Sequence, residues 1–221
     1  MIFHTATDPL YYKSFYTSYS YTIKKFYPHD SLSLHFVGDN KPTNSNINFI
    51  TTTNISFEDI KQQYNCNDDA AKGFYALARW FSIPETDQNV VVSDADIIAL
   101  KKLNIEQVNN LFKTHHAINI TRTKKNGSEG GMAMLILRHD VISDINRVAL
   151  SVLDNTLQWD SDVQVRTHIY NNYNVAEIPE MHVFGKRSNY KTLDNTERSF
   201  AIYKGRLNRK IAALEQAIEN I

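Results

Sequence analysis

The chain has 221 residues, which is enough for one sizeable core and short for two. Its 24 basic and 24 acidic residues give a formal net charge of zero, so no global field draws it to a nucleic-acid polymer or an acidic membrane. The single cysteine, Cys66, excludes an intramolecular disulfide and suits a reducing compartment.

We expect neither a membrane span nor a secretory signal in this sequence. No apolar run approaches the roughly 20 residues that a transmembrane helix needs, and the N-terminus has no basic leader followed by an apolar stretch. We therefore expect one compact cytoplasmic domain. The Asn- and Tyr-rich, Gly-poor composition is typical of an AT-rich genome, bacterial or viral.

The first half of the chain alternates predicted strands and helices. Strands are predicted over residues 1–7, 31–37 and 47–53, and helices over 11–27 and 68–81. Asp68 and Asp69 favour the N-terminus of the second helix, and Pro84 follows its end.

The second half continues this alternation. Helices are predicted over residues 105–112, 141–157, 163–173 and 196–221, strands over 117–123 and 132–137, and a flexible segment over 124–131. Alternating strands and helices indicate an α/β fold with a mostly parallel central sheet flanked by helices, here with a C-terminal helix.

Two aspartates follow an unbroken run of β-branched residues. Val90, Val91 and Val92 lead through Ser93 into Asp94-Ala95-Asp96, an Asp-x-Asp (DXD) pattern. In an extended chain the side chains of residues i and i+2 point to the same side, so both carboxylates would face together and bind Mg²⁺ or Mn²⁺. Ligands of open α/β sheets bind at this carboxyl end of the strands.

Several classes of phosphate enzyme do not fit this pattern. No Gly-x-x-x-x-Gly-Lys-Ser/Thr loop is present, which excludes a P-loop. A haloacid dehalogenase would need threonine where Ile98 stands, and a sugar nucleotidyltransferase would need a glycine loop where residues 1–20 contain no glycine. Nucleotide-sugar chemistry is the leading candidate that remains.

Five segments, in this order, resemble a GT-A glycosyltransferase, and most closely glycosyltransferase family 8, the group of glycogenin and the bacterial galactosyltransferases. Residues 5–11 resemble the first strand and its Asp-x-x-Tyr nucleotide loop, and 74–84 the helix whose arginine reaches the donor. Residues 91–97 resemble the metal-binding strand, 130–136 the acceptor segment, and 181–186 the late His-x-x-Gly-x-x-Lys element. In this chain Lys186 directly follows Gly185, and Glu129 or Gly130 stands where the family has asparagine.

The resemblance implies a metal centre and a donor site. Asp94, Asp96 and His182 would hold Mn²⁺, with Mg²⁺ as an alternative. The implied donor and nucleotide contacts are Thr5, Ala6, Thr7, Asp8, Tyr11, Arg79, Asp94, Ala95, Gly185 and Lys186. For Asp8 the competing interpretation is an Asp-Pro turn, and for Arg79 it is a surface arginine.

The resemblance also implies catalytic and acceptor residues. Lys186 would stabilise the departing UDP, Gln164 would lie beneath the anomeric carbon, and Asp162 would touch sugar hydroxyls. Asp160-Ser161-Asp162 is equally consistent with a plain helix N-cap. Gly130, Gly131 and Met132 would lie on the acceptor side.

These residues together suggest a metal-dependent transferase. It would move a hexose from UDP-glucose or UDP-galactose, with retention, to a glycan, a lipid-linked sugar or a protein, and would hydrolyse the donor slowly without acceptor. A non-catalytic nucleotide-sugar-binding protein and a metal-dependent nucleotide diphosphatase are the alternatives. Residues 1–100 would form the donor half, 101–195 the acceptor half and 196–221 the C-terminal helix.

Overall fold

The computed structural model describes residues 1–39, 42–43, 47–95, 97–99, 102–120, 134–178, 182–184 and 199–203, with backbone alone for 97–99, 182–184 and 199–203. The strands are β1 (Ile2–Thr7), β2 (Ser31–Val37), β3 (Phe49–Thr53), β4 (Val90–Ser93), β5 (Ile97–Ala99), β6 (Ala117–Asn119), β7 (Met134–Leu137), β8 (Val175–Glu177), β9 (His182–Phe184) and β10 (Ser199–Tyr203). The helices are α1 (Pro9–Tyr11), α2 (Thr17–Phe26), α3 (Phe57–Gln63), α4 (Asp68–Phe81), α5 (Ile105–Leu111), α6 (Ile142–Thr156) and α7 (Ser161–Asn172), with a π-helix η1 (Tyr12–Tyr16) and a 3-10 turn η2 (His139–Val141).

Seven strands form one mostly parallel sheet, in the order β3-β2-β1-β4-β7-β6-β8. The interior strand β1 is parallel to both of its neighbours, β2 and β4. β7 runs antiparallel to β4 and β6. The α/β class and the mostly parallel sheet are therefore confirmed. Because β1 and β4 are parallel neighbours, their carboxyl ends lie at the same edge of the sheet.

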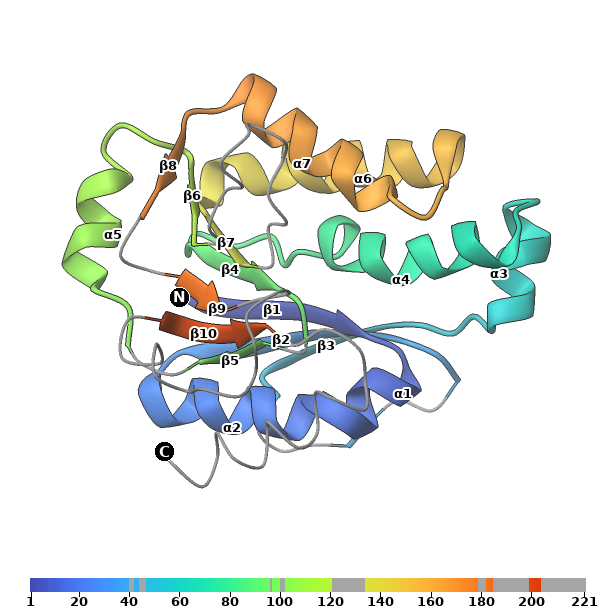
Figure 1. Cartoon of the computed structure of the whole chain (residues 1–221), viewed down its shortest axis with the longest axis horizontal. Helices are drawn as coiled ribbons and strands as arrows, with labels where there is room; N and C mark the ends of the chain where they lie inside the picture. The colour runs from blue at the N-terminus through green and yellow to red at the C-terminus, as the bar shows by residue number, and fades with distance from the viewer. Residues whose placement is uncertain are drawn as a thin grey trace.

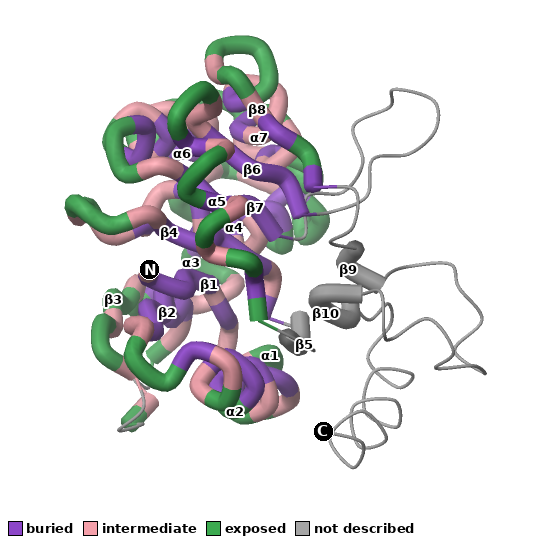
Figure 2. Tube along the Cα trace, turned by 90° about the vertical axis from the view of Figure 1, so that its left-hand side faces the viewer, coloured by how far each residue is buried: buried purple, intermediate pink, exposed green. Residues whose placement is uncertain are grey.

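Helices cover both faces of this sheet (Figure 1). Alternation along β1 divides the core, since successive side chains of a strand point to opposite faces: Phe3 packs with residues of α2 and α5, and Ile2 packs with residues of α3, α4, α6 and α7. Figure 2 shows the inner strands of the sheet buried between these layers, whereas the edge strand β3 is largely exposed. In the part of the chain that is described, no helix has both the length and the apolarity to cross a membrane.

Local sequence explains where α3 and α4 begin. The Asn67 side chain caps α4 by accepting a hydrogen bond from the Ala70 amide, and the helix matches the predicted residues 68–81. α3 was not predicted, although Ser56 and Asp59 form a complete capping box at its start. The box is a sequence signal for this short helix, whose buried residue is Ile60.

The C-terminal segment differs from expectation. A helix is predicted over residues 196–221, yet Ser199–Tyr203 form β10, which pairs with β5 and β9 in a second, three-stranded sheet. The helix prediction is wrong for these residues because pairing with distant strands overrides local periodicity. Residues 204–221 lie outside the described part of the chain.

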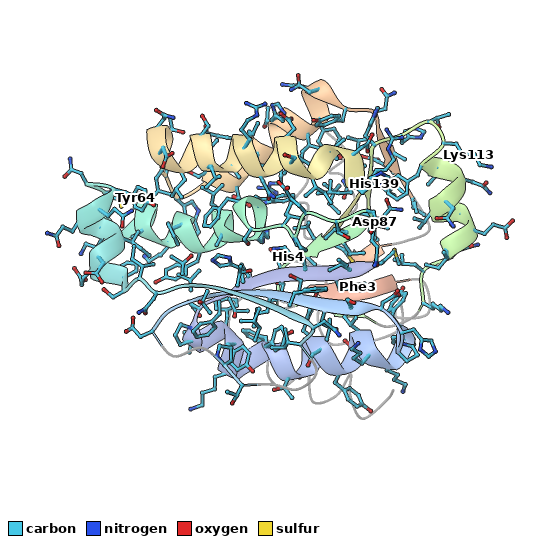
Figure 3. The ribbon with its side chains drawn as sticks, turned by 180° about the vertical axis from the view of Figure 1, so that it is seen from behind. Phe3, His4, Tyr64, Asp87, Lys113 and His139 are labelled. Atoms are coloured by element: carbon cyan, nitrogen blue, oxygen red, sulfur yellow. The ribbon has the colours of Figure 1, made fainter. Side chains whose placement is uncertain are left out.

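Two buried histidines lie on adjacent strands under α4. His4 Nδ1 lies 3.0 Å from Ser33 Oγ and its Nε2 lies 3.3 Å from Ser82 Oγ, while His35 Nε2 lies 3.0 Å from Thr53 Oγ1. Figure 3 shows His4 and its neighbour Phe3 on β1. Burial lowers the pKa of His4 to about 3 and that of His35 to about 4, so both rings are neutral at pH 7.

These histidines predict a loss of stability in mild acid. The unfolded chain binds protons at His4 and His35 near pH 6.5, whereas the folded chain does not. The free energy of unfolding therefore keeps its highest value above pH 6.5 and decreases as the pH falls below 6.5. The loss is about 2 kcal/mol for each histidine at pH 5. Urea unfolding from pH 7 to pH 5 measures it. His35→Gln should reduce the change in the free energy of unfolding between pH 7 and pH 5. The control His139→Gln, at an exposed position, should leave this change as in the wild type. A free energy of unfolding that does not change with pH in the wild type would contradict the prediction.

Candidate functional site

The site lies where β1 and β4 end. β4 ends at Ser93, Asp94 follows it directly, Ala95 lies in a turn, and β5 begins at Ile97. The predicted placement of the Asp94 and Asp96 carboxylates on one side of the chain stays a prediction. Asp96 itself lies outside the described residues.

Arg79 joins the two described aspartates of the site. Its Nη1 pairs with Asp94 Oδ1, and its Nη2 lies 3.0 Å from Asp162 Oδ2. The side chains of Arg79 and Asp162 are 12% and 13% exposed, so these charges are largely withdrawn from water. Such charges are tolerated only when they are paired. Three residues that are distant in sequence thus form one charged cluster.

A second arginine completes this cluster. Arg166 Nη2 lies 3.3 Å from Asp162 Oδ2, and its Nε donates to the Asp162 carbonyl oxygen at 3.3 Å. We refer to Arg79, Asp94, Asp162 and Arg166 as the arginine–aspartate cluster. Arg166 was not among the predicted site residues. The available signal was its spacing of four residues from Asp162, which directly precedes the predicted helix over 163–173, because side chains with this spacing are neighbours on a helix surface.

Three elements position the cluster. Arg79 lies in the last turn of α4, where a cation is favoured by the helix dipole, and its guanidinium lies 5.5 Å from the Trp80 ring centroid. Asp94 directly follows the buried strand β4, whose valines fix it at the edge of the sheet. Asp162 lies in the first turn of α7, a favourable position for an anion.

The connection that leads into α7 is tightly held. Ser161 is fully buried: its Oγ accepts a hydrogen bond from the Gln158 amide at 2.7 Å and donates to Thr156 O at 3.2 Å. Gly73 of α4 lies directly beneath, where an added Cβ would come within 1.9 Å of Gln158 O. The absence of a side chain at Gly73 lets α4 and the start of α7 pack closely together. This close packing places Asp162 beside Arg79.

Gln164 lies apart from the cluster. Its side chain is exposed, and its Oε1 accepts a hydrogen bond from Thr156 Oγ1 at 3.2 Å, at the end of α6. Two residues along a helix correspond to a rotation of about 200°, so Gln164 and Asp162 face opposite sides of α7. The structure therefore unites Asp162 with the predicted donor residues but does not bring Gln164 to them.

The predicted nucleotide residues surround the end of β1. Thr5 Oγ1 donates to Ser93 O at 2.8 Å and so links β1 to the end of β4. Asp8 caps α1, and its side chain accepts a hydrogen bond from the Tyr11 amide at 2.6 Å. This contact matches the alternative interpretation of Asp8 as part of an Asp-Pro turn. Burial raises the pKa of Asp8. Of the described side chains, buried Thr7 is one whose hydroxyl has no hydrogen-bond partner.

α4 contributes to both ends of this site. Burial and the nearby Asp8 charge raise the pKa of Tyr75, so Tyr75 lies close to the end of β1. Arg79 follows Tyr75 by four residues and hence lies on the same face of α4. This face therefore extends from the predicted nucleotide loop to the arginine–aspartate cluster. Ala6 and Ala95 lie at the same strand ends, half-buried and buried respectively.

The remaining predicted residues cannot be placed. Asp96, Gly130, Gly131, Met132, Gly185 and Lys186 lie outside the described residues, and for His182 the structure describes only backbone, in β9. The described side chains include no group of three His, Cys, Asp or Glu residues that could hold a metal ion. The metal centre therefore stays a prediction whose one described ligand is Asp94.

Comparison with known proteins identifies the fold. No protein-family model matches the sequence, and no curated protein sequence matches it significantly. The galactosyltransferase LgtC, solved with donor and acceptor sugar analogs, matches with a TM-score of 0.52 and 10% identity, over 99% of this chain and 94% of LgtC. An active-site mutant of LgtC matches equally well, at 11% identity.

Two further glycosyltransferases are longer than this chain. The bifunctional glycosyltransferase WbbM matches with a TM-score of 0.54 and 10% identity, over 100% of this chain and 49% of WbbM. GlyE of Streptococcus pneumoniae TIGR4 shares 11% identity over 81% of this chain and 45% of GlyE, with a TM-score of 0.47. The chain spans about half the length of both. The match to LgtC confirms the expected GT-A fold, and at these identities the likeness is one of fold.

Gly73 provides a test of this packing. Gly73→Ala should lower the free energy of unfolding by about 2 kcal/mol, because the new methyl group meets the backbone of Gln158, which cannot yield as a side chain would. Urea denaturation measures the change. The matched control is Lys72→Ala, at an exposed position next to Gly73, which should change stability by less than about 0.5 kcal/mol. Stabilisation by Gly73→Ala, as expected for a helical glycine with free space around it, would refute the contact.

Proposed function

We propose that this chain is a glycosyltransferase that uses a nucleotide-sugar donor. The arginine–aspartate cluster carries the proposal, because it lies at the carboxyl end of β4 in a GT-A fold, beside the end of β1. Ligands of open α/β sheets bind at this edge. The cluster offers guanidinium donors for phosphate or sugar oxygens and carboxylate acceptors for sugar hydroxyls.

Within this proposal the donor is a UDP-hexose, glucose or galactose, as the resemblance to family 8 implies. Asp8 and Tyr11 would contact the uracil, and Thr5, Ala6 and Thr7 would line the nucleotide. The buried Thr7 hydroxyl, which no described residue pairs, supports a ligand at this place, since buried polar groups normally have a partner. Tyr75, near Asp8, extends the same wall.

We further propose that the enzyme binds a divalent cation. Asp94, Asp96 and His182 would hold it, and two carboxylates with an imidazole suit Mn²⁺. The cation would supply charge neutralisation to the diphosphate. Asp94 Oδ1 already pairs with Arg79, so Asp94 would offer its other oxygen or exchange partners when the cation enters.

The described residues would then divide the chemical work. Arg79 would bind the sugar or its phosphate, Asp162 would accept hydrogen bonds from sugar hydroxyls, and Lys186 would neutralise the charge that develops on the departing UDP. Retention at the anomeric carbon is part of the proposal by resemblance alone. Gln164, on the far side of α7 from Asp162, lends no support to a role beneath that carbon. The acceptor would enter on the side of Gly130, Gly131 and Met132.

Loss of Arg79 should abolish most of the activity. Arg79→Gln removes the charge that joins Asp94 to Asp162, and kcat/KM for UDP release from UDP-glucose or UDP-galactose should fall by about 100-fold. The control is Arg147→Gln, because Arg147 forms a surface pair with Asp144 and is 72% exposed; its kcat/KM should match the wild type. Unchanged turnover in Arg79→Gln would contradict the assignment of the site.

The metal centre can be tested separately by calorimetry. UDP should bind the wild type more tightly with Mn²⁺ than without it, and Asp96→Asn should abolish this difference while leaving the melting temperature of the metal-free protein within a few degrees. Unfolding of the variant would show that the carboxylate is structural. UDP binding without transfer or hydrolysis of any donor would favour a non-catalytic binding protein, and cleavage of UDP itself a nucleotide diphosphatase.

A further inference from the structure

Asp162 is held by two guanidinium groups at a single oxygen. Arg79 Nη2 lies 3.0 Å and Arg166 Nη2 lies 3.3 Å from the same Oδ2 atom, and the three side chains are between 12% and 14% exposed. Arg166 also donates from Nε to the Asp162 carbonyl oxygen. The two arginines come from different helices, α4 and α7, so the carboxylate is fixed from two directions.

The other oxygen of Asp162, Oδ1, takes no part in these contacts. Among the described residues, none donates a hydrogen bond to Oδ1. An ionised carboxylate has about four lone-pair sites on its two oxygens, so Oδ1 retains its capacity to accept. Because both arginines hold Oδ2, the orientation of the carboxylate is fixed. Two guanidinium cations already neutralise its charge, so Oδ1 suits a ligand hydroxyl more than a further cation.

Resting on the proposed function, we propose that Arg166 is a positioning residue that fixes Asp162 so that Oδ1 accepts a hydrogen bond from one hydroxyl of the transferred hexose. The pair of Arg166 and Asp162 thereby sets which hexose the enzyme accepts. A site built to bind a hydroxyl rejects a sugar that cannot offer it, since the buried acceptor is then left unpaired. Arg79 alone is insufficient because it is shared with Asp94.

The identity of the residue at position 166 is central to this role. Arginine presents several N–H groups in a rigid plane, and here it uses Nε for the backbone and Nη2 for the carboxylate. Lysine would keep the charge but lose the second contact. Glutamine would lose the charge and leave the carboxylate of Asp162 free to rotate about Arg79.

The test uses UDP release from UDP-hexoses that differ at a single hydroxyl, such as UDP-glucose and UDP-galactose. The wild type should prefer one of them, and Arg166→Gln should reduce the ratio of their kcat/KM values by about 10-fold, chiefly through the KM of the preferred donor. Arg166→Lys should restore part of the ratio. The affinity for UDP without sugar should change by less than about 2-fold, because the hydroxyl contact concerns the sugar alone.

Controls separate this role from a structural one. Arg147→Gln, at the exposed pair with Asp144, should keep the wild-type ratio. Asp162→Asn should lose the preference by itself, and adding Arg166→Gln to it should cause no further loss, because both act through one contact. If Arg166→Gln fails to fold, the ratio of the two kcat/KM values in Arg166→Lys tests the role of Arg166. A ratio below that of the wild type supports the role, and an unchanged ratio contradicts it.

The outcomes are distinguishable. A wild type that discriminates together with an Arg166→Gln variant that keeps the full ratio overturns the role of Arg166 and leaves the proposed function intact. A parallel loss of UDP affinity would show a general structural role and would also overturn it. A wild type that turns over both donors equally contradicts the hydroxyl contact, and one that releases UDP from no donor overturns the proposed function together with this inference.

Discussion

The pairing of Arg79 with Asp94 and Asp162 is the interaction on which the candidate site depends. Three elements meet there: the end of α4, the turn after β4 and the start of α7. Each contributes a charge that would be costly in this half-buried place without its partners. The pairing therefore constrains the relative positions of the helices as well as their chemistry. Gly73, Ser161 and the connection before α7 are the means by which the backbone meets this constraint.

The two faces of the sheet have different roles around this pairing. On the face of α2, Ser93 Oγ donates to Tyr19 OH at 3.1 Å, within a layer of large aromatic side chains. On the opposite face, His4 and His35 lie under α4 as neutral rings. Asp94 follows the last strand residue and turns toward the α4 face. The charged groups thus gather where the strands end, and uncharged polar groups lie within the sheet.

Much of the fold could be predicted from sequence because it depends on local signals. The valines of β4 and the capped, periodic α4 appear at the expected residues. The helix α3 was missed although its capping box is a local signal, whereas the error at the C-terminal segment involves long-range pairing. Ser199–Tyr203 form a strand because β5 and β9 pair with them. In the site, Arg79 and Asp162 were predicted from resemblance, whereas the rotation of α7 that turns Gln164 away and Arg166 inward requires coordinates.

The position of β1 inside the sheet, between β2 and β4, has a consequence for how the protein folds. Its hydrogen-bonded neighbours are β2, close in the chain, and β4, with the Thr5–Ser93 contact spanning 88 residues. Closing so long a loop costs entropy. The pairing of β1 with β2 can therefore form early during synthesis, before β4 pairs with β1. Asp162 is synthesised later still. Nascent chains therefore carry Arg79 without its second carboxylate, and the charged cluster is completed only once the start of α7 has been made.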